Sequence, residues 1–137
     1  MSSIIAISEA ASLALHSMAA IAREGEGPVS LGRITASTGI SSAHLAKVLQ
    51  RLVKAGLLHS TRGPRGGFEP ARPIGEITLL EVYEAIEGPL DDRACLLPGK
   101  GCPFRFSRCL FGDLIAETNK RFRDYLSQTT IQSLLED

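Results

Sequence analysis

No stretch of the sequence is long and apolar enough to cross a membrane. A spanning helix needs roughly 20 mostly apolar residues, and no run within the 137 residues approaches that length. Residues 1–22 are rich in apolar side chains, but no basic segment precedes them, and Glu9 and His16 interrupt them. Because a signal peptide has the opposite features, we expect a helix of the mature protein here. We also expect a cytoplasmic protein with no membrane partner.

Signatures of catalysis are missing as well. The chain has no Gly-rich phosphate loop ahead of a helix and no nucleophile beside a supporting base. It has no C-x-x-C pair, and no βαβ pattern surrounds its cysteines, which argues against a thiol oxidoreductase. We therefore predict that the protein is not an enzyme and has no small-molecule substrate.

The chain lacks a net charge, but its charges are unevenly distributed. It has 15 basic and 15 acidic residues, yet residues 28–73 contain seven bases and one acid, a balance of +6. A basic block in a neutral protein suggests a face that binds a polyanion, usually nucleic acid, although a solvated surface has the same composition. The seven bases are Arg33, Lys47, Arg51, Lys54, Arg62, Arg65 and Arg72.

Two short helices are predicted within this basic block. Ser30 is a suitable N-cap for residues 31–38, and Gly39 ends that segment. Ser41 then caps residues 42–55. Two helices joined by a tight Gly turn match the helix-turn-helix pattern, although a helical hairpin without special function is the alternative. The apolar residues at helical spacing in the second helix are Leu45, Val48, Leu49 and Leu52.

A β-hairpin is predicted directly after these helices. Residues 57–60 and 68–70 read as short strands, and the turn between them, residues 61–67, is rich in Gly and Pro. A hairpin in this place is typical of a wing, although a basic hairpin of no special function is possible. Arginines in its turn are suited to phosphates or a minor groove, and glycines allow a close approach. The wing residues expected to contact DNA are Arg62, Gly63, Arg65 and Gly66.

Three more helices complete the expected fold. Ser8 caps a first helix that runs to about residue 22, and Thr78 caps a helix over residues 79–87. Pro103 is expected to open a long helix that ends near Ser127, with a heptad-like apolar stripe suited to pairing with a second copy. A capped turn or short helix should follow.

The predicted fold is therefore mainly α with a small β-hairpin wing. A winged helix-turn-helix domain over residues 1–90 should bind DNA. A cysteine-rich cluster loop should follow at residues 91–103. The long dimerisation helix and its tail should occupy residues 104–137.

All three cysteines lie in one short stretch. Cys95, Cys102 and Cys109 form a C-x6-C-x6-C array, and Gly and Pro residues mark its first part as a loop. An odd number of cysteines cannot pair off within one chain. A metal or iron–sulfur site, a redox thiol switch and an intermolecular disulfide are the open interpretations.

In its order of motifs, the chain resembles the Rrf2 family of bacterial winged-helix regulators, of the IscR- and NsrR-like iron–sulfur sensor type. The segments that carry the resemblance are AGLLHSTRGPRGGFEPARP, ITLLEVYEAIEG and the cysteine triplet. The resemblance implies a homodimer that binds a palindromic operator in double-stranded DNA. It makes residues 41–55 the recognition helix, with Arg51 nearer the DNA backbone. The residues it offers to the major groove are Ser41, Ser42, His44 and Lys47.

The resemblance also implies an iron–sulfur cluster held by Cys95, Cys102 and Cys109. Similar regulators have a histidine three residues after the last cysteine, where this chain has Gly112. Others take a ligand from the first helix of the partner subunit, where Ser12 and His16 stand here. We expect His16 to be the fourth ligand, with a core or interface histidine as the alternative.

A histidine ligand favours a 2Fe–2S over a 4Fe–4S cluster. The alternative function is a metal-free thiol-switch or zinc-stabilised regulator of the same fold.

Overall fold

The computed structural model describes residues 6–91, 95–97 and 99–136. Within these residues it is mainly helical, with one antiparallel two-stranded hairpin, as predicted. No described helix has the length and apolar character needed to cross a membrane. The elements are α1 (Glu9–Arg23), α2 (Leu31–Thr38), α3 (Ser42–Lys54), β1 (Leu58–Thr61), β2 (Gly67–Pro70), the 3-10 helix η1 (Ile74–Glu76), α4 (Leu79–Glu87), α5 (Leu114–Gln128) and the 3-10 helix η2 (Gln132–Leu134).

The predicted helix starts are largely confirmed by the caps. The hydroxyl of Ser8 accepts a hydrogen bond from the backbone N–H of Ala11, and that of Ser30 accepts one from Arg33. Gly39 ends α2 in the left-handed conformation, with φ of 72°, which a residue with a Cβ rarely adopts. Ser41 occupies the N-cap of α3, but its side chain makes no capping hydrogen bond.

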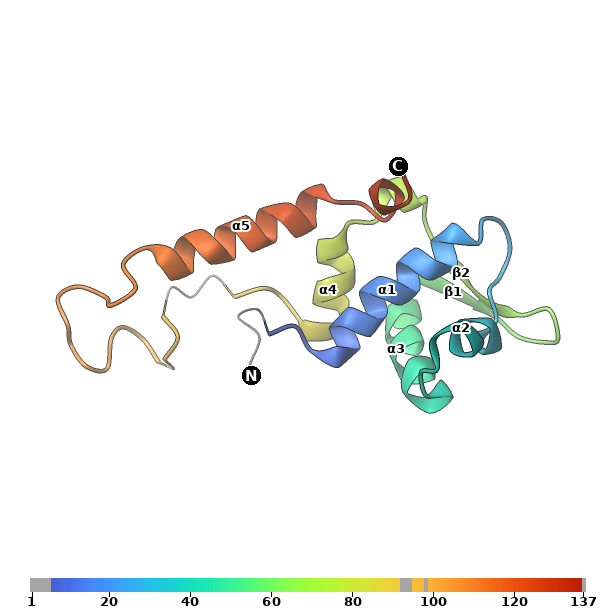
Figure 1. Cartoon of the computed structure of the whole chain (residues 1–137), viewed down its shortest axis with the longest axis horizontal. Coiled ribbons are helices and arrows are strands. Elements are labelled where there is room, and N and C mark those ends of the chain that lie inside the picture. The colour runs from blue at the N-terminus through green and yellow to red at the C-terminus, as the bar shows by residue number, and fades with distance from the viewer. Residues whose placement is uncertain (1–5, 92–94, 98, 137) are drawn as a thin grey trace.

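The core forms where α1 lies across α3 and α4 (Figure 1). Ala11, Ala14 and Met18 are completely buried on one face of α1. Small residues at two of these positions permit close helix packing, and the apolar area removed from water stabilises the arrangement. The buried stripe of α3 that faces this core is Leu45, Val48, Leu49 and Leu52, as the sequence pattern predicted.

The wing is anchored to the body at its base. Phe68 of β2 is buried, and it exchanges two backbone hydrogen bonds with Val29, at 2.8 and 2.9 Å. Gly67 is required at this crossing, because a Cβ there would lie 2.3 Å from the carbonyl oxygen of Val29. The hairpin therefore has a fixed base and an exposed tip.

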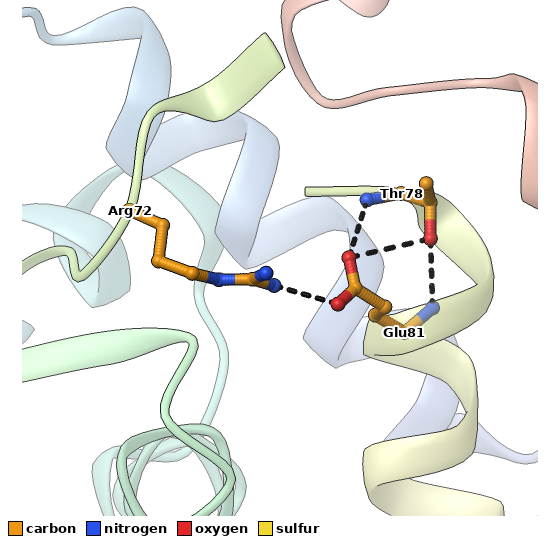
Figure 2. A network of polar contacts seen from close by, with 3 residues as sticks. All are labelled: Arg72, Thr78 and Glu81. Atoms are coloured by element: carbon orange, nitrogen blue, oxygen red, sulfur yellow. Dashed lines mark hydrogen bonds and ion pairs between the residues drawn. The ribbon is translucent and has the colours of Figure 1, made fainter. Parts of the chain in front are cut away.

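A polar network joins the end of the wing to the start of α4 (Figure 2). Thr78 and Glu81 form a capping box, in which each side chain accepts a hydrogen bond from the other residue's backbone N–H. Arg72 donates to Oε1 of Glu81 at 2.7 Å. Partial burial raises the pKa of Glu81, but the bonds from the Thr78 backbone and Arg72 lower it by more, so its pKa lies below the ordinary value.

The prediction of a helix from Pro103 to Ser127 is wrong for the residues before Leu114. Residues 102–113 form turns, and α5 begins at Leu114. Proline is a favourable first residue of a helix, but Arg105 and Gly112 both adopt positive φ, at 55° and 54°. An α-helix cannot pass through such residues.

Only the C-terminal end of α5 packs against the body of the protomer. Leu126 is buried, and the ring of Phe122 meets that of Tyr83 edge to face at 5.7 Å. Arg123 donates to the carbonyl of Leu90 at 2.7 Å. Figure 1 shows α5 leading away from the other helices, with the cysteine loop at its far end. The helix thus holds the loop at a distance from the core.

We predict that Thr78→Ala lowers the free energy of unfolding by about 1 kcal/mol, because it removes a cap that accepts a hydrogen bond. Urea titration followed by circular dichroism measures the change. Ser41→Ala is the matched control and should cost clearly less, since Ser41 makes no capping hydrogen bond. Equal costs at the two positions would contradict the structural role given to the capping box.

Candidate DNA-binding surface and cysteine loop

The face of α3 opposite the buried stripe is exposed and basic. Lys47, Gln50 and Lys54 are exposed, and they recur at the spacing of one helical face. The sequence interpretation named only Lys47 of these three. Helical spacing from the buried leucines could have identified Gln50 and Lys54 as well.

The other residues predicted for the recognition helix lie in two different environments. Ser41 and Ser42 are exposed at the N-terminal end of α3, where backbone N–H groups favour phosphate. His44 and Arg51 are seven residues apart, on the flank that faces α1 and α4. Arg51 donates to the carbonyl oxygen of Ile86 at the end of α4, so its guanidinium joins two helices of the protein.

The residues predicted for the wing contact lie at the tip of the hairpin. Arg62, Gly63 and Arg65 are exposed, and within the described residues neither arginine makes an ion pair. Gly66 is half-buried, and a Cβ there would lie 2.1 Å from the carbonyl oxygen of Thr61. Gly66 therefore shapes the turn, and the two arginines remain available for phosphate.

The three cysteines line one apolar pocket. All are free thiols, and the cavity volume is about 320 Å³. Among the described residues, no group of three His, Cys, Asp or Glu side chains converges closely enough to hold a single metal ion. The thiols therefore share a pocket without forming a closed metal site. The other residues that line the pocket are Leu96, Leu97, Phe104, Phe106, Leu110 and Phe111.

Cys102 differs from the other two cysteines in its surroundings. Backbone N–H groups of Phe106, Phe104 and Arg105 donate to its sulfur and lower the pKa of its thiol below the ordinary value, although slight desolvation opposes them. The thiolate is the form that binds metal and attacks oxidants. The loop backbone thus favours the reactive form of Cys102.

The structure does not bring His16 and the cysteines together within one protomer. His16 lies exposed on α1, in the body of the molecule, and the cysteine loop lies beyond the far end of α5 (Figure 1). Its Nδ1 is 2.7 Å from the carbonyl oxygen of Ser12. A carbonyl only accepts, so Nδ1 donates its N–H to Ser12, and Nε2 is the ring nitrogen not used in this bond.

Comparison with known proteins finds matches to transcriptional regulators. The model of the Rrf2 family, described as an iron-dependent transcriptional regulator, matches residues 7–137. The HTH-type transcriptional regulator IscR of Xenorhabdus nematophila is 35% identical over 126 residues, which cover 91% of this chain and 71% of that protein.

Two solved structures of regulators named CymR are similar over nearly the whole chain. The global cysteine regulator CymR of B. subtilis has a TM-score of 0.80 and 26% identity, with 98% of this chain and 100% of that chain covered. The oxidized form of Staphylococcus aureus CymR has a TM-score of 0.78 and 25% identity, with 97% and 98% covered.

We predict that Arg65→Ala weakens binding to duplex DNA and lowers the salt dependence of that binding. Loss of one phosphate contact should reduce the slope of log K against log salt by about 1. Fluorescence anisotropy with a random-sequence 30-base-pair duplex at several salt concentrations measures both effects.

The control for this variant is Lys120→Ala, which removes one positive charge from α5, where Lys120 pairs with Asp124 at 2.6 Å. It should leave the slope unchanged. An unchanged slope for Arg65→Ala would remove the wing from the DNA-binding surface.

Proposed function

This chain belongs to the Rrf2 family of transcriptional regulators, and we propose that an iron–sulfur cluster in its cysteine loop controls its affinity for DNA. The winged helix-turn-helix identifies a DNA-binding regulator and not an enzyme. The proposed working form is a cytoplasmic homodimer on a palindromic operator. The observation that carries the proposal is that all three free thiols line one apolar pocket.

The residues of the pocket fit an iron–sulfur cluster in their chemistry. Thiolates are the preferred ligands of such clusters, and an apolar shell limits access of water. A cluster has several irons, so its thiolate ligands need not converge on one point as the ligands of a single ion must. When bound, the cluster supplies a group whose charge and stability respond to iron, oxygen, nitric oxide or redox state. Arg105 and Arg108 lie in the loop and could offset the thiolate charge.

We propose that His16 of the partner subunit completes the ligand set. The hydrogen bond from Nδ1 to Ser12 leaves Nε2 as the free nitrogen on an exposed imidazole. A metal-ligating histidine usually donates its other N–H in this way. A histidine ligand favours 2Fe–2S over 4Fe–4S, as in clusters where histidine replaces cysteine on one iron.

A second copy of the chain would cover the apolar surface left open by one protomer. The exposed fractions of Phe104, Leu110 and Leu114 are 67%, 84% and 56%. Tyr125, further along α5, is 60% exposed. Several large apolar side chains exposed near one another in the sequence favour an interface, and a two-fold dimer buries the same surface on both copies.

The contacts of α5 offer a route from the loop to the DNA-binding domain. The backbone N–H of Leu79 donates to Thr129 at 2.9 Å, and that of Ile131 donates to Ile77 at 2.9 Å. Thr78 and Glu81 then connect the start of α4 to the wing through Arg72 (Figure 2). Since operator half-sites lie roughly 34 Å apart, a small shift of α5 could change the fit of two domains to DNA.

A metal-free thiol switch is the second candidate function. The lowered pKa of Cys102 favours its oxidation, and the similar CymR structure was determined in an oxidized form. A zinc-stabilised regulator would use the same cysteines in a closed tetrahedral site.

Anaerobic purification followed by an absorption spectrum and iron and sulfide analysis separates these functions. The cluster protein is coloured and contains both elements, whereas the zinc and metal-free proteins are colourless. Operator affinity is then compared for loaded, cluster-free and oxidised protein at one salt concentration. Equal affinity in all three states would refute control by the cysteine loop.

We predict that Cys102→Ala abolishes cluster loading but leaves a folded dimer, because the pocket lies outside the buried core. Iron content and the visible spectrum measure loading, and size-exclusion chromatography measures the dimer. Ser107→Ala, in the same loop, should retain both. Full colour and iron in Cys102→Ala would exclude Cys102 as a ligand.

We predict that His16→Ala still binds a cluster, but that the cluster is lost faster in air or has a shifted potential, since one ligand is replaced. Decay of the visible absorption over time gives the rate, with His59→Ala on the exposed wing strand as the control. If the visible spectrum of His16→Ala and the rate at which it decays were both unchanged, His16 would not be a ligand but an interface residue.

A further inference from the structure

We propose that His44 and Glu9 form a contact between α1 and α3 that orients the recognition helix, and that His44 does not read a base. His44 is the third residue of α3, where the sequence alone suggested a DNA contact. Its Nε2 is shielded from water, and no described group lies within hydrogen-bond distance of it. The carboxylate oxygen Oε1 of Glu9 is 4.0 Å away.

The position of His44 on α3 supports this role. Lys47 and Gln50 lie opposite the buried stripe, on the face open to a DNA groove. His44 shares its flank with Arg51, which bonds to the end of α4. The flank that holds both residues therefore borders α1 and α4, with the His44 side chain 41% exposed and Arg51 exposed beside its bond to Ile86.

The geometry favours closure of the pair at small cost. A shielded nitrogen that lacks a partner costs free energy, which a hydrogen bond would recover. A contact of 4.0 Å exceeds normal hydrogen-bond length by about 1 Å. The Glu9 side chain is 89% exposed, so it can move without disturbing the core. Glu9 itself is fixed in place by its helix, because Ser8 caps α1 and also bonds to Glu87 of α4.

Closure of this contact would set the angle at which α3 enters the groove. The N-terminal turn of α3 lacks a side-chain cap, since Ser41 makes no capping hydrogen bond. His44 is the residue of that turn that faces α1. Fixing the turn before DNA binds reduces the ordering that binding must supply. His44 is thus a positioning residue for Ser41, Ser42 and Lys47.

A double-mutant cycle on DNA affinity tests the proposal. The probe is a duplex recovered by selection from a random-sequence library with the wild-type protein. The variants are Glu9→Gln, His44→Leu and the double variant, with Glu26→Gln in an exposed loop as the control. Each single change at the pair should weaken binding about 3- to 10-fold, and the double variant should be no weaker than the weaker single variant. His44→Gln, which keeps a donor, should recover part of the loss.

Two further readouts decide between this role and others. Library selection repeated with His44→Leu should recover the same sequence as wild type. A different preferred base, with Glu9→Gln silent, would make His44 a base-reading residue and overturn the proposal. If the losses of DNA affinity in Glu9→Gln and His44→Leu added up in the double variant, the proposal would also be overturned. If the variants were less stable in urea but bound DNA with unchanged affinity when folded, the contact would serve stability alone. That result would also overturn the proposal.

Discussion

The packing of α1 across α3 and α4 is the contact on which the rest of the structure depends. Ala11 and Ala14 are small enough to bring the three helices close together, and both are fully buried. This one helix touches the recognition helix through its buried face and carries His16 on its exposed side. The DNA-binding surface and the proposed ligand from the partner are therefore fixed by the same rigid element.

The two ends of the molecule differ in how their side chains are held. In the winged domain, backbone pairing and caps hold the elements that carry the functional side chains, as the reciprocal bonds of Val29 and Phe68 at the base of the wing show. In the cysteine loop, the pocket is formed by exposed apolar side chains such as Leu110. The winged domain thus presents its surface on paired and capped backbone, and the proposed cluster site lies among exposed apolar side chains.

The sequence correctly predicted those features of the fold that depend only on neighbouring residues in the chain. Caps such as Ser8 and Ser30 and the Gly-rich wing turn were recognised because each needs only its neighbours in the chain. The start of α5 was missed because Pro103 and the apolar spacing favour a helix, while the left-handed Arg105 interrupts it. The proximity of His44 to Glu9 of α1 was not predicted, since it depends on where α1 lies, and a one-dimensional pattern does not contain that information.

The placement of the core has a consequence for how such a protein gains and loses a cluster. In the described part of the chain, no buried core residue lies between Ile86 and Leu126, the interval that contains every cysteine. The core therefore contains no described residue of the cysteine loop, and it is completed by Leu126 and Ile131, which follow that loop in the chain. Under the proposed function, gain or loss of the cluster would then leave the buried core of the winged domain unchanged.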